Sequence, residues 1–168
     1  MNRKIKLLIM MVVVFIGVGL TVRIYYVNKN VKIIKEECFV NVPFTVNNVL
    51  YKVVEYSARE DKNFEECVVL DVKINIKNNS ESDQECDFTE IMLDYNDNCK
   101  NVSMDAFYQM SQQEAGLCTI TPPGDEFDVV LPFLINKGQL NNGSTVDFNK
   151  AQLVFSLYPT KKYMNLHT

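Results

Sequence analysis

Five cysteines are the residues of this sequence best suited to covalent chemistry: Cys38, Cys67, Cys86, Cys99 and Cys118. No two of them form a Cys-x-x-Cys pair, so their spacing argues against a zinc ribbon and against a thioredoxin-type redox site. Two alternatives remain. The cysteines either form disulfide bonds, or they are free thiols in an anaerobe or in a reducing compartment.

A second group of candidate residues could bind calcium. Asp94, Asn96, Asn98 and Asp105 occur at offsets that a calcium-binding loop uses for its carboxylate and amide ligands. The glycine that makes the sharp turn of such a loop is replaced by Cys99, and the final glutamate is replaced by an aspartate. A hairpin turn between two strands explains the same residues without an ion. Calcium or solute sensing is therefore kept as an alternative function.

The residues needed for acid–base or nucleophilic catalysis are sparse. The only histidine is His167, close to the end of the chain, so the commonest general base is missing from the body of the sequence. Several carboxylates could still pair after folding, namely Glu65, Glu66, Glu114, Asp125, Glu126 and Asp128. We expect no enzymatic activity and no cofactor, with a carboxylate-based hydrolase as an alternative.

The segment from Phe107 to Met110 is the best candidate for contact with a partner. Phe107, Tyr108 and Met110 lie in a stretch without strand periodicity, and exposed aromatic residues and methionines are enriched at protein interfaces. Their alternative role is to close one end of the fold.

The net charge of −4 and the scattered basic residues predict no binding of nucleic acid.

The N-terminus contains a long apolar run. Leu7–Val22 has no charged residue and follows three basic residues; with its continuation it approaches the roughly 20 residues that cross a bilayer as a helix. We predict a transmembrane signal anchor over residues 1–27 and a linker over residues 28–37. A cleaved signal peptide is the alternative, although the only small-x-small site, Gly17-Val18-Gly19, lies inside the run.

The orientation of this anchor follows from its position. Three basic residues precede the run and four follow it closely, so the positive-inside rule gives almost a tie. Because the run stands at the extreme N-terminus, as signal sequences do, we expect a single-pass protein of the cell membrane with its C-terminal domain outside the cell.

The rest of the chain has the pattern of β-strands. In Cys67–Ser80, apolar residues alternate with polar ones, and a second long alternation, Phe127–Ile135, follows the turn Thr121-Pro122-Pro123-Gly124. We expect about seven short strands separated by Gly, Pro and Asn turns, which is typical of an all-β, antiparallel, immunoglobulin-like sandwich. This domain is predicted over residues 38–160, with a tail over residues 161–168.

Further strands are expected at Phe39–Val46, Val49–Tyr56 and Phe88–Tyr95, with a last one near Leu153–Leu157. Pro43 favours an edge position for the first of these. Residues 105–116 fit no strand period and are expected to hold a short helix.

Two segments carry a family resemblance: the strand VVLDVKINIKNNS and the TPPG turn that runs into the next long strand. With FTEIMLDYNDN and LVFSLYP, they resemble the uncharacterised telokin-like, immunoglobulin-like extracellular domains of Gram-positive bacteria, over roughly Val40 to Tyr158. The resemblance implies that the two long strands are neighbours in one sheet and pair Val68–Lys77 with Glu126–Ile135. It implies no active site.

The expected strand order also suggests how the cysteines would pair. If the first long strand and the strand after it run antiparallel, Cys67 and Cys99 lie at one end of the sandwich, and Cys86 and Cys118 lie at the other. The favoured bridges are therefore 67–99 and 86–118, with Cys38 unpaired and accessible.

The expected function is that of a membrane-anchored extracellular domain that binds a protein or cell-envelope partner through its loops.

Overall fold

The computed structural model describes residues 10–12, 14, 16–23, 34–110, 115–140, 145–157 and 160–166. The chain divides into two compact units, Met1–Ile33 and Ile34–Thr168. In the first unit the described residues are helical, and the rest of the predicted anchor lies outside the described residues. Among the described helices, none is both long enough and apolar enough to cross a membrane.

The second unit is built on β4 (Cys67–Asn78), the long strand that the sequence predicts. Leu70, Val72, Ile74 and Ile76 are fully buried, while the residues between them are partly exposed, so the predicted alternation is confirmed. β4 pairs antiparallel with β9 (Glu126–Asn136). Val68 lies opposite Ile135 and Lys77 opposite Glu126, which is the register that the family resemblance implies.

A four-stranded sheet surrounds this pair in the order β2-β3-β4-β9, with β2 at Phe44–Val46 and β3 at Val49–Glu60. The expected edge strand near Pro43 is confirmed as β2. Asn47 and Asn48 connect β2 to β3 with φ angles of 48° and 67°, and two consecutive positive φ angles are typical of a type I′ hairpin turn.

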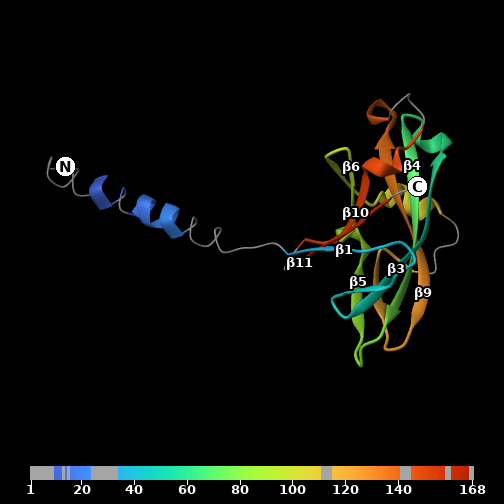
Figure 1. Cartoon of the computed structure of the whole chain (residues 1–168), viewed down its shortest axis with the longest axis horizontal. Helices are drawn as coiled ribbons and strands as arrows, with labels where there is room; N and C mark the ends of the chain where they lie inside the picture. The colour runs from blue at the N-terminus through green and yellow to red at the C-terminus, as the bar shows by residue number, and fades with distance from the viewer. Residues whose placement is uncertain are drawn as a thin grey trace. The chain divides into compact units, whose positions relative to one another are not determined.

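The layer that faces this sheet is divided into two smaller sheets (Figure 1). The five-stranded sheet has the order β1-β11-β10-β6-β7, and the two-stranded sheet consists of β5 and β8. Their bounds are β1 Ile34–Glu37, β5 Gln84–Asp87, β6 Met92–Tyr95, β7 Asn98–Asn101, β8 Cys118–Thr121, β10 Ala151–Ser156 and β11 Thr160–Asn165. All pairs are antiparallel except β1 with β11. The fold is therefore a β-sandwich.

The structure corrects the predicted boundaries. β1 lies in the predicted linker and β11 in the predicted tail, and the described residues form eleven strands where about seven were expected. β11 escaped prediction because its segment TKKYMN carries few apolar residues. Met164 and the following Leu166 are nevertheless fully buried in the core, so this segment is an integral part of the sandwich.

Short helices interrupt the strands where a polar side chain caps the backbone. The predicted strand Phe88–Tyr95 begins instead with the 3-10 helix η2 (Phe88–Glu90), because the Asp87 carboxylate accepts a hydrogen bond from the Thr89 backbone N–H. The other 3-10 helices are η1 Lys62–Phe64, η3 Lys137–Gln139 and η4 Phe148–Lys150, and the expected short helix is α2 (Met104–Gln109).

The Pro-Pro-Gly turn forms as predicted. Gly124 has φ +82°, a conformation that residues with a Cβ rarely adopt, and Pro123 precedes it at the position where type II turns favour proline. The Asp125 N–H donates to the Pro122 carbonyl at 3.2 Å. This turn directs the chain from β8 into β9.

Candidate functional site

Helix α2 carries the residues predicted to contact a partner, and it presents only part of them. Tyr108 is 70% exposed, whereas Phe107 is 1% exposed and belongs to the core. Met110 is partly buried, and the neighbouring Met104 is 58% exposed. Phe107 is therefore not available for contact with a partner, because its ring packs in the core. This agrees with the alternative role, in which these residues close one end of the fold. Met104 and Tyr108 are the exposed large hydrophobic side chains of this helix.

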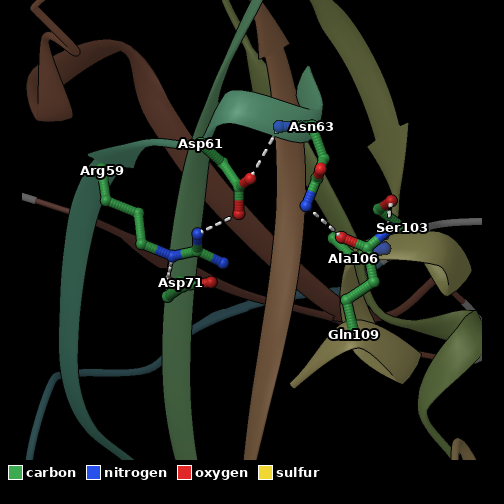
Figure 2. A network of polar contacts seen from close by, with 7 residues as sticks. All are labelled: Arg59, Asp61, Asn63, Asp71, Ser103, Ala106 and Gln109. Carbon is green, nitrogen blue, oxygen red and sulfur yellow. Dashed lines mark hydrogen bonds and ion pairs between the residues drawn. The ribbon is translucent and has the colours of Figure 1, made fainter. Parts of the chain in front are cut away.

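A polar network holds α2 in place (Figure 2). The Ser103 hydroxyl accepts a hydrogen bond from the Ala106 N–H at 3.3 Å, which caps the start of the helix. At its end, the Gln109 side-chain oxygen accepts a hydrogen bond from the Asn63 amide at 2.9 Å. Asn63 belongs to η1, so this bond ties α2 to the connection between β3 and β4.

The other half of Figure 2 is an ion-pair cluster. The Arg59 guanidinium contacts both Asp61 and Asp71, with Nε 2.6 Å from the Asp71 carboxylate. Burial raises the pKa of Asp71, although Arg59 acts in the opposite direction. The cluster joins neighbouring strands β3 and β4, and we assign it a structural role.

The predicted calcium loop is a β-hairpin. Asp94 lies on β6, and Asn96 and Asp97 have φ angles of 53° and 62°, which give a type I′ turn from β6 into β7. The Asn98 amide donates to the Asn96 carbonyl at 2.9 Å, and Asp105 belongs to α2. In the described part of the chain, no group of three or more His, Cys, Asp or Glu residues could hold a metal ion. The hairpin that was the alternative explanation of these residues is present in the structure.

All five cysteines are free thiols. Cys86 and Cys118 lie on paired strands, but Cys118 is opposite Asp87, so the two thiols face opposite sides of the sheet. The buried Cys86 Sγ lies 3.4 Å from the Thr121 hydroxyl, and the exposed Cys118 donates to the Glu85 carboxylate. The predicted 86–118 bridge is thus incompatible with this register.

The remaining cysteines differ in environment. Cys67 lies opposite Asn136 and Cys99 opposite Asp94, and no bridge joins them. Cys38 was expected to be accessible but is only 5% exposed. Burial, followed by the charge of Glu36, raises the pKa of the Cys38 thiol to about 11.

A groove that the sequence did not reveal opens where the three sheets meet. It consists of two adjoining hollows of about 240 and 380 Å³ that share Val46, Asn47, Glu90 and Phe155. The first hollow is also lined by Val49, Tyr51, Glu85, Asp87 and Ile91, and the second by Thr89, Met92, Ser156 and Leu157. We call this site the hairpin groove, because the β2–β3 hairpin forms one of its walls.

Aromatic packing fixes the wall on the side of the core. The Phe155 ring, from β10, lies 4.7 Å from the Phe44 ring in an edge-on arrangement and 6.1 Å from the Tyr51 ring. Phe44 and Tyr51 are directly opposite each other on β2 and β3. Such aromatic contacts make this wall rigid and apolar.

Three carboxylates form the opposite wall. On β5, the exposed Glu85 and Asp87 share one face, because Cys86 between them points into the core; Glu90 follows on η2. Within the described residues, none of these three carboxylates forms an ion pair with Lys or Arg. Burial, the Cys86 thiol, and the charges of Glu90 and Asp87 together raise the pKa of Tyr51. The groove therefore combines a negative wall with an apolar one.

Residues 47–162 match the family model described as a domain of unknown function, DUF5028. The chain belongs to this family. The match begins at the hairpin of the groove and ends in β11, so it includes both strands of the long β4–β9 pair. A comparison with curated proteins found no match.

Two of the solved structures that resemble this DUF5028 chain show the shared fold. The YjhA protein of Bacillus subtilis has a TM-score of 0.55 and 11% identity, over 77% of this chain and 98% of its own. An uncharacterised β-sandwich protein of Clostridium difficile 630 has a TM-score of 0.53 and 12% identity, over 81% of this chain and 97% of its own. At such identities the likeness shows the fold alone. The resemblance is confirmed as far as an uncharacterised β-sandwich family.

Proposed function

We propose that this DUF5028 protein is a non-catalytic binding domain that is anchored in the cell membrane and engages a protein or cell-envelope partner outside the cell. The hairpin groove is the observation that carries the proposal. It places carboxylates beside apolar side chains in one concave site, and ligands bind preferentially in concave sites. The resemblance of this domain to extracellular, immunoglobulin-like domains of Gram-positive bacteria also supports this role.

The composition of the N-terminal segment supports the proposed anchor. Its described apolar side chains are 48% to 67% exposed on every side of the helix: Met10, Met11, Val12, Val14, Ile16, Val18, Leu20 and Val22. A helix that is apolar all round is stable where an apolar medium surrounds it. The Thr21 hydroxyl donates to the Gly17 carbonyl at 2.7 Å, so this polar group is satisfied within the helix.

Partner capture from detergent-solubilised native membranes tests the binding role. The full-length protein serves as bait, and Leu157→Asp is compared with Tyr108→Ala. Leu157 is 54% exposed at the groove and Tyr108 is exposed on α2, so neither substitution disturbs the core. We expect Leu157→Asp to abolish capture and Tyr108→Ala to preserve it. Equal capture by Leu157→Asp and the unmodified protein would refute binding through the groove.

A further inference from the structure

The charge and shape of the hairpin groove identify the class of its occupant. Resting on the binding role proposed above, we propose that the groove binds an extended peptide segment of a partner protein in which a basic side chain stands next to an apolar one. Three features carry this assignment: the charge of one wall, the apolar surface of the other, and the free edge of β2.

The negative wall selects a positive group. Glu85, Asp87 and Glu90 all line the first hollow, and among the described residues neither hollow is lined by Lys, Arg or His. Asp87 is held in place because its carboxylate accepts hydrogen bonds from the Thr89 N–H and hydroxyl at 2.9 and 2.6 Å. A Lys or Arg side chain placed here would meet carboxylates that lack a cationic partner in the described structure, which is electrostatic complementarity.

The second hollow provides an apolar subsite. Met92, Phe155 and Leu157 line it, and Leu157 is 54% exposed, so its side chain is accessible to a ligand. Glu90 and Phe155 line both hollows, so the charged and apolar subsites adjoin. A ligand that fills both must present its two kinds of side chain close together.

The edge of β2 favours a peptide over a free amine. β2 is the outermost strand of its sheet and pairs only with β3 among the described strands. Such an edge presents backbone N–H and C=O groups that an extended peptide can pair with. Val46, the last residue of β2, lines both hollows, so a strand added to this edge would lead its side chains into the groove.

Fluorescence anisotropy with defined peptides tests this inference. The full-length protein in neutral detergent is titrated into labelled hexapeptides that alternate Lys with Leu, Glu with Leu, or Lys with Ser. We expect the Lys–Leu peptide to bind about ten-fold or more tightly than the other two, and its affinity to fall as salt is added.

Charge reversal locates the site. Glu90→Lys is expected to weaken Lys–Leu binding about ten-fold. Glu65→Lys is the matched control, since Glu65 is also exposed but lies beside η1, outside the groove. Both variants should unfold at the same urea concentration as the unmodified protein, because both carboxylates are exposed.

The outcomes separate this inference from the proposed function. Equal binding of the Lys–Leu and Glu–Leu peptides, both lost in Leu157→Asp, would overturn the basic occupant while leaving the groove as a binding site. Unchanged Lys–Leu affinity in Glu90→Lys, or no binding of any peptide, would overturn the inference as well. The membrane capture experiment decides the binding role independently.

Discussion

Neighbouring residues of β4 have opposite environments, and this difference can be measured. Ile74 is fully buried, whereas Lys73 is partly exposed and pairs with Asp128 at 3.1 Å. Ile74→Asp places a charge in the core and should cost several kcal/mol, comparable with the roughly 5–15 kcal/mol of a whole domain. Lys73→Gln removes an exposed ion pair and should cost about 1 kcal/mol or less. Equal urea midpoints for the two variants would contradict the assignment of the two faces.

The cysteines should differ in reactivity as their burial predicts. Cys99 is exposed, while Cys38 is buried with a pKa of about 11 against an ordinary 9.0. Because the thiolate is the reactive form, Cys38 at neutral pH has a thiolate population about a hundred-fold smaller than an ordinary thiol. A thiol reagent followed by peptide mapping should label Cys99 first. Labelling of Cys38 at the same rate would contradict its burial in the core.

The raised pKa of Cys38 also makes stability depend on pH. The unfolded thiol loses its proton near pH 9.0, whereas the folded one keeps it until about pH 11. This thiol therefore adds stability below pH 9, and that contribution is lost as the pH rises towards 11. In Cys38→Ala this part of the alkaline destabilisation should be absent from urea unfolding followed across this pH range.

Residue patterns predicted the burial of side chains correctly where a single strand determines it. They failed where burial depends on contacts between several elements. The alternation of Leu70 to Ile76 follows from the strand alone. The burial of Phe107 depends on the packing of α2, and the accessibility of Cys38 depends on the pairing of β1 with β11. Neither the core surface against which α2 packs nor the strand β11 could be recognised from the local sequence.

At the scale of elements, the strongest departure from the sequence prediction is β11. The prediction ended the domain at residue 160 and placed a tail after it, but β11 pairs with β10 and β1. By contrast, the register of β4 with β9 was predicted, because the family resemblance carried by these two long segments and the Pro-Pro-Gly turn implies it. Short strands with few apolar residues lack such a signal and are fixed only by their neighbours.

Deletion of residues 160–168 should therefore destabilise the sandwich severely. It removes the buried Met164 and Leu166, and a buried side chain of this size contributes about 1.5–3 kcal/mol. It also leaves β1 without its partner and β10 with an open edge. Circular dichroism during urea titration measures the loss, and deletion of residues 167–168 alone is the control. If the protein without residues 160–168 unfolded at the same urea concentration as the unmodified protein, this segment would be a tail after all.

At the scale of the whole molecule, the groove shows why a site can be absent from the sequence. Its walls come from three segments: the β2–β3 hairpin, residues 85–92, and residues 155–157. Each segment alone looks like an ordinary turn or a solvated charged strand. Only the division of the facing layer into two sheets brings them together, and that division rests on long-range strand pairing.

The proposed anchor predicts the orientation of the whole protein. Protease added to intact protoplasts should remove the sandwich by cutting beyond about residue 30, since the domain would lie outside the membrane. Lysed protoplasts and a cytoplasmic marker protein provide the controls. Protection of the sandwich until lysis would place it inside the cell and refute the proposed location.

Site-specific photo-crosslinking in living cells tests binding at the groove most directly. A photoreactive amino acid is placed at position 157 in the groove or, as a control, at position 65 beside η1, with and without Glu90→Lys. Binding at the groove predicts a discrete crosslinked product from position 157 that disappears with Glu90→Lys, and none from position 65. The same products from both positions, or no product from position 157, would contradict it.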